Sequence, residues 1–412
     1  MDRRLAEAVI ATFRETERDT LARQLACLRL RDWRRGLRWL DASGLALYFR
    51  KQIGTAGLEE CFPPEILRVL DERVAYNKQR TNELFKECAV INSAFQKAGL
   101  HYINLKGFTL VPDYCPDPSL RCQFDLDFML SASDLNLSKD ILKTFGYVVT
   151  GTHKNVMEFK AGISRIPSIH DLYKPRSQRS VEVHVVPERQ AAPASDNSPL
   201  SRQQKRVWNG VAFPALSEGD MFLAQANHLF RHLKSEWTRA SWLLEFRTFV
   251  NSRSRDTQFW QTVRSQSAIN DEDALAVGIA VLLVTEAFGE FGPPELVGWS
   301  VDAVARSVRL WLESYGRTVL LADFPGTKLY LLLDRELANG EGAKAILWSK
   351  LFPMHRPPRV AYPDSGGFAV NIRANLSQIW FTLYRLRFHI VEGSRCLIAA
   401  QQWKRRVSGQ TV

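Results

Sequence analysis

The sequence lacks the cysteine patterns of metal-binding and disulfide-stabilised domains. Its six cysteines are scattered through 412 residues, and no two of them form a C-x-x-C pair. This spacing suggests neither a zinc knuckle nor a disulfide framework. We therefore expect reduced thiols, as in a cytoplasmic protein.

Long apolar runs, an apolar leader and internal repeats are also absent. The longest apolar run, residues 274–285, has 12 residues, whereas a membrane-spanning helix needs about 20. The first 19 residues carry charges throughout and lack the apolar centre of a signal peptide. The sequence therefore predicts a cytoplasmic protein without a transmembrane segment, in which residues 274–285 form a buried helix.

Acidic residues are fewer than basic ones. With 55 Lys and Arg against 44 Asp and Glu, the formal net charge is +11. A nucleotide, a nucleic acid or a membrane surface would each suit this balance, which by itself does not distinguish them. The 45% hydrophobic and 24% charged fractions are those of an ordinary soluble globular protein, long enough for two or three domains.

Residues 1–99 have the pattern of an N-terminal helical region. Apolar residues recur at intervals of three and four, and a proline pair suits the first turn of a helix that ends at Gly99. Arginines cluster between residues 29 and 38, beside Trp33 and Trp39. This cluster could be a nucleic-acid surface, but we favour a solvated basic face whose tryptophans turn inward.

Residues 100–190 alternate short strands with helices. The segment HYINLKG is typical of a strand that runs into a glycine turn, and we expect a helix to start at Phe108. The segments FDLDFML, NVMEFKAG and RSVEVHVVP have the alternation of strands. This order indicates a small α/β domain.

The remaining chain is predicted to be mainly helical. Residues 191–206 are polar and rich in Pro and Ser, which favours a loop. Residues 207–345 are predicted to form helices that pack on the core, with Ser217 as an N-cap. Residues 346–412 combine an irregular proline-rich segment, 351–367, with basic amphipathic helices. These helices could lie on a membrane surface, although docking on the core is the commoner arrangement.

Two carboxylates interrupt an apolar run. Asp125 and Asp127 lie within residues 124–130, and in a strand they would share one face, with Leu126 and Phe128 on the other. Carboxylates next to a core must face water or a cation, because burial without a partner is too costly. Mg²⁺ favours a pair of carboxylates completed by phosphate oxygens.

Three further residues fit a phosphate site. Lys106 and Gly107 form a turn before the expected helix, whose N-terminus would bind phosphate, and the lysine could neutralise a triphosphate. Arg121 could reach the same phosphates or brace the first aspartate. The alternatives are a surface lysine and an arginine paired with Asp113 or Asp117.

A third carboxylate is available in residues 179–186. Val181 and Val183 would face one way, Glu182 and His184 the other. If this strand joins the same sheet, Glu182 lies beside the two aspartates, and three carboxylates can hold two metal ions. The alternative is an ordinary solvated strand face.

Together these motifs resemble a known family, the uncharacterised nucleotidyltransferase family of the DNA polymerase β-like nucleotidyltransferase superfamily. The resemblance covers mainly residues 100–250, where a helix end and a helical histidine pair followed by tryptophan also match. The wider superfamily has Gly-Ser where this chain has Lys-Gly, and Glu245 stands where the family often has Asp. The matching residues are Lys106-Gly107, Arg121-x-x-x-Asp125-x-Asp127, Gly146-Tyr147, Glu182-x-His184, His228, His232 and Trp242.

The resemblance implies an α+β fold, mostly helical, in which a small mixed β-sheet core is flanked by N-terminal and C-terminal helical regions. It implies Mg²⁺ or Mn²⁺ as the cofactor. His228 and His232, four apart on a helix, are half of a zinc site, but no third ligand has a matching spacing. The implied metal ligands are Asp125, Asp127 and Glu182; the implied phosphate-binding residues are Lys106, Gly107 and Arg121; the accessory residues are His184, His228 and His232.

We therefore predict a metal-dependent nucleotidyltransferase that transfers an NMP from an NTP to an acceptor and releases pyrophosphate. The acceptor stays open between a small molecule, a peptide, a protein and an RNA. One alternative is a catalytically inactive protein of the same fold that binds a nucleotide or a partner. Another is a basic helical protein that binds nucleic acid or a membrane surface.

Overall fold

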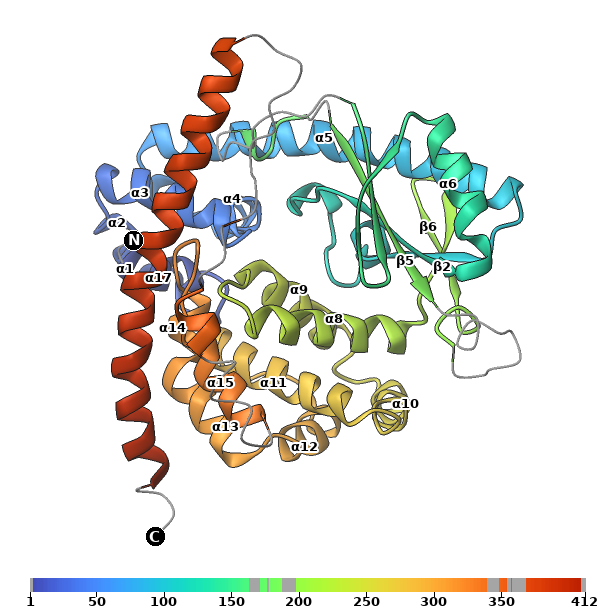
Figure 1. The fold of residues 1–412 in the computed structure, drawn as a ribbon. Helices are drawn as coiled ribbons and strands as arrows, with labels where there is room; N and C mark the ends of the chain where they lie inside the picture. Colours follow the sequence, from blue (N-terminus) through green and yellow to red (C-terminus); the bar gives the residue numbers. More distant parts are fainter. Residues whose placement is uncertain are drawn as a thin grey trace.

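The computed structural model confirms the predicted α+β class. Helices dominate, and the described residues contain one seven-stranded mixed sheet (Figure 1). In the described part of the chain, no helix is both long enough and apolar enough to cross a membrane. The structure describes residues 3–162, 171–175, 178–186, 198–338, 348–353, 357 and 368–408.

The N-terminal region is helical, as predicted. Its last helix begins with a proline in the first turn, and Gly99, which follows it, has a φ of +71°. Trp33 and Trp39 are both buried, which confirms their inward orientation. The elements are α1 (Arg3–Ala11), α2 (Arg18–Ala26), α3 (Leu30–Ala42), α4 (Ala46–Thr55), the 3₁₀ turn η1 (Glu59–Cys61) and α5 (Pro64–Lys97).

The sheet has the strand order β3-β4-β5-β2-β1-β7-β6. The pairs β2–β5 and β1–β7 are parallel, and the other neighbours are antiparallel. The strands are β1 (Tyr102–Leu105), β2 (Leu126–Ser131), β3 (Val148–His153), β4 (Val156–Ala161), β5 (Arg179–Val186), β6 (Gln204–Trp208) and β7 (Val211–Ala215).

The two faces of the sheet have opposite characters. On one face, Leu126, Phe128, Val181 and Val183 pack in an apolar cluster with α5 and with α6 (Leu135–Thr144). The other face carries the polar residues of β2 and β5 and is directed to the helices that follow the sheet (Figure 1). This alternation was predicted for both strands, and it is confirmed.

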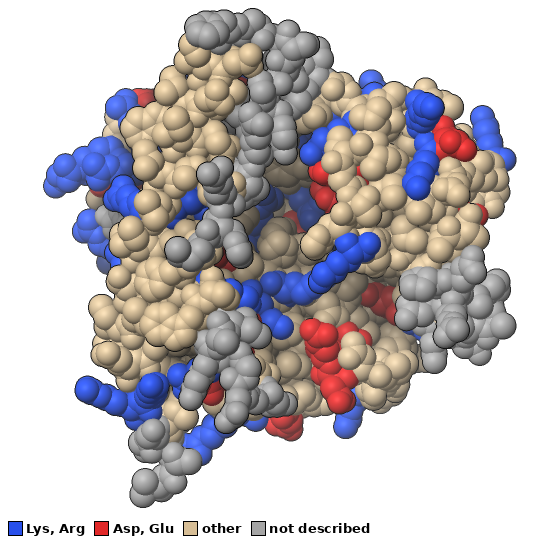
Figure 2. Space-filling view, in the orientation of Figure 1, with Lys and Arg blue, Asp and Glu red and all other residues tan. Residues whose placement is uncertain are grey.

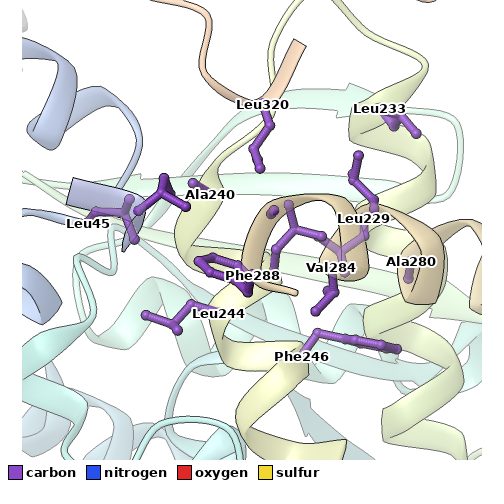
Figure 3. Close-up of a cluster of buried hydrophobic side chains, with 14 of the residues drawn as sticks. Leu45, Leu229, Leu233, Ala240, Leu244, Phe246, Ala280, Val284, Phe288 and Leu320 are labelled. Carbon is purple, nitrogen blue, oxygen red and sulfur yellow. The ribbon is translucent and has the colours of Figure 1, made fainter. Parts of the chain in front are cut away.

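The helices after the sheet share the larger of the two apolar cores with the N-terminal helices, and part of this core is drawn in Figure 3. Ser217 caps the first of them by accepting a hydrogen bond from the Asp220 amide, as predicted. The run 274–285 lies in a buried helix, also as predicted. The helices are α8 (Glu218–Leu233), α9 (Ala240–Ser252), α10 (Thr257–Ser267), α11 (Asp271–Phe288), α12 (Pro294–Asp302), α13 (Arg306–Trp311), the π-helical turn η6 (Leu312–Gly316), α14 (Arg317–Leu320) and α15 (Tyr330–Leu337).

The C-terminal segment is one long helix, α17 (Phe368–Ser408), rather than a pair. One face docks on the helical core, where Phe388, Cys396 and Trp403 are buried and Trp403 Nε1 donates to Glu336 at 2.8 Å. The opposite face is apolar but exposed, with side chains between 40% and 71% accessible. This stripe consists of Ile372, Leu376, Ile379, Trp380, Leu383, Leu386, Ile390, Val391 and Ile398.

Two local predictions were wrong. The expected helix from Phe108 is only a four-residue 3₁₀ turn, η2 (Gly107–Leu110). The end of the expected loop and the start of the expected helical region instead form the hairpin β6–β7. Residues 191–197 of the loop predicted at 191–206, and most of the irregular segment predicted at 351–367, lie outside the described residues.

Candidate functional site

The centre of the site is built from two adjacent parallel strands. The register of β2 and β5 sets Asp127 opposite Glu182 and Met129 opposite His184. His184 Nε2 lies 3.5 Å from Asp127 Oδ1 and 3.8 Å from Glu182 Oε2. One ligand atom from each of these three polar residues lies within 4.8 Å of the others. The carboxylates predicted from separate segments of the sequence therefore converge.

Asp125 completes the acidic group just before β2. Burial and the charge of Asp127 raise the pKa of Asp125. Burial, Asp127 and Asp125 likewise raise the pKa of Glu182. Burial also opposes ionisation of Asp127, but His184 and Lys106 outweigh it and lower the pKa of this carboxyl. Ionisation of one carboxyl therefore disfavours ionisation of the others. A bound cation would relieve the repulsion between the three negative charges.

The lysine-glycine turn lies against this acidic group. Lys106 Nζ is 3.3 Å from Asp127 Oδ1. Lys106 has a φ of +52°, a region that non-glycine residues adopt only with strain, and Gly107 follows at +54°. A Cβ on Gly107 would lie 2.3 Å from Gln123 Nε2, which donates to the Asp125 carbonyl at 2.9 Å. Glycine thus lets the turn approach the chain that carries Asp125.

The turn does not lead into a helix, so one predicted feature is missing. η2 has four residues, and its short 3₁₀ geometry gives no extended helix dipole or set of free amides for a triphosphate. The expectation of a helix N-terminus as the phosphate site is therefore wrong. Lys106 is the feature of this turn that remains available for phosphate.

Arg121 has a different partner from those expected. Its Nε donates to both oxygens of Glu245 in α9, at 3.2 and 3.3 Å, and both side chains are largely buried. Asp113 pairs with Arg206 instead, and Asp117 accepts a hydrogen bond from the Ser119 amide. Arg121 therefore pairs with neither Asp113 nor Asp117. Burial raises the pKa of Asp125, and the positive charge of Arg121 opposes part of that rise.

The helical histidines form an aromatic wall with Trp242. The rings of His228 and His232 are 4.5 Å apart, and each lies within 4.6 Å of the Trp242 ring. Burial lowers the pKa of His228 to about 2 and that of His232 to about 4, and the charge of Lys106 contributes to both shifts. Both histidines are therefore neutral near pH 7 and lie within electrostatic reach of Lys106, which contacts Asp127.

The sequence analysis missed Arg239, a cation at the edge of this wall. Its guanidinium lies 5.7 Å from the Phe124 ring centroid, 5.2 Å from that of Trp237 and 5.5 Å from that of Trp242. Interleaved tryptophan and arginine in the stretch SEWTRASW was the available signal. A planar group entering here would find aromatic rings and a cation within stacking distance.

The donor set fits a divalent metal ion. The group comprises two carboxylates and one imidazole, and His184 Nε2 is buried with no hydrogen-bond partner in the part of the chain described. Carboxylates suit Mg²⁺ and Mn²⁺, while a neutral imidazole suits Mn²⁺ better than Mg²⁺. Asp127, Glu182 and His184 could hold such an ion, with Asp125 adjacent.

Comparison with known protein families identifies the family of the chain. Residues 29–288, more than half of the chain, match the family described as uncharacterised nucleotidyltransferase. Among solved structures, an antigenic nucleotidyltransferase-like protein from Paracoccidioides brasiliensis is similar to this chain at 13% identity and a TM-score of 0.30, covering 47% of this chain and 92% of that one. No curated protein matches the sequence. The chain belongs to the uncharacterised nucleotidyltransferase family.

Proposed function

We propose that the protein transfers a nucleoside monophosphate from an NTP to an acceptor and releases pyrophosphate. The observation that carries this proposal is the convergence of Asp127 and Glu182 from adjacent parallel strands, with Asp125 and Lys106 beside them. Acidic groups in contact with a lysine suit the binding of a cation together with phosphates.

The proposed reaction needs little covalent chemistry from the protein. An oxygen of the acceptor forms a bond to the α-phosphorus, the bond from that phosphorus to the β-bridging oxygen breaks, and pyrophosphate leaves. Asp125, Asp127 and Glu182 would hold the divalent cation, which when bound supplies neutralisation of the phosphate charge. Glu182 is half-buried with a raised pKa, which suits it to take the acceptor's proton.

The surrounding residues would position the substrates. Lys106 would contact the phosphates, and Gly107 allows the close turn that presents it. Arg121, held by Glu245, would fix the segment before Asp125 rather than contact phosphate directly. His184 would orient or share the cation. The wall of His228, His232 and Trp242, together with Arg239, would stack the nucleobase.

The test is transfer from α-labelled NTPs. Each of the four NTPs is incubated with Mg²⁺ or Mn²⁺ and candidate acceptors, and pyrophosphate release and labelled product are measured. Asp125→Asn and Glu182→Gln should abolish transfer. Glu158→Gln is the matched control, because Glu158 lies directly opposite Glu182 in β4 but outside the acidic group. Labelling unchanged in the first two variants would contradict the proposal, and tight binding without turnover would favour an inactive nucleotide-binding protein.

The exposed stripe of α17 favours a second property, peripheral binding to an anionic membrane surface. The stripe places nine large apolar side chains on one helix face. The helix carries seven Lys and Arg residues against one Glu, so charge complementarity favours anionic headgroups over another copy of this basic helix.

Vesicle sedimentation tests this property. Vesicles containing phosphatidylserine should retain the protein, and pure phosphatidylcholine vesicles should retain much less. Replacing Leu383 and Leu386 by Ser should release it. The same replacement of Val148 and Val149, which are exposed in β3, should not. Self-association without vesicle binding would show that a second copy covers the stripe.

A further inference from the structure

A cavity lies away from the acidic group, between α3 and α5. Its volume is about 550 Å³, the size of a site for a small organic molecule. Figure 2 shows one face of the molecule, which is hollowed near its middle with Lys and Arg side chains around the hollow. Six lining residues carry the argument: Arg34, Arg38 and Asp41 of α3, Arg73 of α5, and Tyr173 and Lys174.

The charge of this cavity favours an anion. Its lining includes four cationic side chains and two carboxylates. One carboxylate, Glu72, pairs with Arg68 outside the cavity. The other, Asp41, pairs with Arg73 at 2.7 Å, and burial raises the pKa of Asp41 to about 7. Arg34 pairs with Glu65 at 2.8 Å and Lys174 with Asp171 at 2.9 Å, and both acids lie outside the lining. These pairs cancel, so Arg38 leaves the lining with a net positive charge near neutral pH.

The cavity also contains buried polar atoms without a good partner. Asp41 and Tyr173 are 6% and 4% exposed. Within the described residues, Asp41 Oδ1 and Arg73 Nη1 make no hydrogen bond, whereas the Tyr173 hydroxyl lies against the Asp41 carboxyl. Buried polar groups are normally satisfied, so these atoms point to a bound molecule that supplies acceptors and donors. Tyr76 and Leu37 add an aromatic and an apolar wall.

One face of α5 connects the cavity to the acidic group. Arg73, Asn77 and Arg80 are spaced by four and three residues and therefore share this face. Asn77 Nδ2 donates to the carbonyls of Ser119 and Arg121, at 2.6 and 3.1 Å. Arg80 donates to the carbonyl of Gln123, two residues before Asp125, at 2.6 Å. Asn77 and Arg80 are both buried, so this face links the cavity to the acidic group through packed side chains.

We propose that this cavity is a binding site for a small organic anion that carries a phosphate or carboxylate group. The anion site does not depend on the proposed nucleotidyl transfer. The anionic group would lie among the cations of α3 and α5, and its body against Tyr76 and Tyr173. A nucleic-acid end is the less favoured ligand, because the cavity has the volume of a small molecule.

Calorimetry with phenyl phosphate tests the site without any transfer reaction. The titration is run in EDTA and without NTP, and benzyl alcohol is the neutral control ligand. We expect binding of phenyl phosphate and none of benzyl alcohol. Equal binding of both ligands, or no binding of phenyl phosphate, overturns the proposal.

Matched variants locate the bound anion. Arg34→Gln with Arg38→Gln should weaken phenyl phosphate at least about tenfold, because hydrogen bonds to charged groups contribute about 1.5–3 kcal/mol. Arg31→Gln with Arg35→Gln removes the same charge from α3 outside the cavity and should change binding little. Lys174→Gln, at an exposed position, should weaken binding about threefold without risk to the fold. Equal losses in both double variants would overturn the proposal.

One further variant separates the anion site from the proposed reaction. Asp125→Asn with Asp127→Asn should abolish transfer yet bind phenyl phosphate as the wild type does. Loss of phenyl phosphate binding in this variant would place the anion at the acidic group and overturn its assignment to the cavity. Retained binding in a protein that shows no transfer with any acceptor would overturn the proposed function and leave the anion site intact.

Discussion

Replacing Asp127 by Asn is the sharpest test of the proposed metal site. The substitution removes one negative charge and nearly keeps the side-chain volume. Asp127 is 6% exposed, and its Oδ1 lies 3.3 Å from Lys106 Nζ and 3.5 Å from His184 Nε2. The amide would leave both groups without their anionic partner and would hold a cation only through a neutral oxygen.

The expected loss of activity is large. Charge neutralisation by a bound metal contributes several kcal/mol to a phosphoryl-transfer transition state. Losing about 4 kcal/mol corresponds to about a 1,000-fold slower reaction, since each 1.4 kcal/mol is tenfold. The assay is pyrophosphate release at saturating NTP, with Glu158→Gln as the control, which should stay within about twofold of wild type. A loss of less than tenfold for Asp127→Asn would refute the assignment.

The variant also has a signature in its pH dependence. After burial, the charge of Asp127 is the next cause that raises the pKa of Asp125 and of Glu182. A carboxyl with a raised pKa keeps its proton to higher pH, so cation binding in the wild type should begin only above the ordinary range. Asp127→Asn should therefore bind Mn²⁺ more weakly but begin to bind at lower pH. Paramagnetic resonance of free Mn²⁺ measures both, and an onset pH unchanged from wild type would contradict the reasoning.

Three further predictions concern the residues around the acidic group. Lys106→Gly should be more stable to urea than Lys106→Ala by about 1 kcal/mol, because both lose the ion pair but only glycine adopts the φ of +52° without strain; the reverse order would show an unstrained turn. His228 and His232 have folded-state pKa values of about 2 and about 4, below the ordinary 6.5, so the unfolded chain takes up protons first as pH falls. Stability should therefore drop by about 5 kcal/mol between pH 6.5 and 4 in urea titrations, and a variant with both histidines replaced by Asn should lose most of this dependence. Arg121→Met should cost about 3–5 kcal/mol by leaving Glu245 charged and buried, and adding Glu245→Leu should recover much of that loss; a stable single variant with impaired NTP binding would instead favour direct phosphate contact.

The acidic group could be predicted from sequence because strand alternation leaves little choice. Leu126 and Phe128 must face the apolar cluster, so Asp127 must face away, and Val181 and Val183 dictate the same for Glu182. That the two strands lie side by side in one sheet was an assumption at that point. Once it is made, the convergence follows from the two-residue period of each strand.

The predictions for two other elements were wrong for identifiable physical reasons. The apolar residues after Gly107 fit a helix or a short buried turn equally well, because periodicity over four residues cannot separate them. The hairpin β6–β7 was missed because its strands are short and mix polar with apolar residues, although its Asn-Gly turn was recognisable in the sequence. Asn209 and Gly210 both have positive φ, +46° and +76°, in the two-residue turn that Asn-Gly favours between strands.

The partners of buried charges could not be read from the sequence at all. Arg121 and Glu245 are 124 residues apart, and any of several nearer acids would have been an equal choice before the fold brought α9 to the sheet. This pair has a consequence for the proposed site. A buried arginine already neutralised by Glu245 holds its chain segment in place but adds less attraction for phosphate. Lys106 then remains as a cation in direct contact with Asp127, and the strained turn is what places its charge beside the carboxylates.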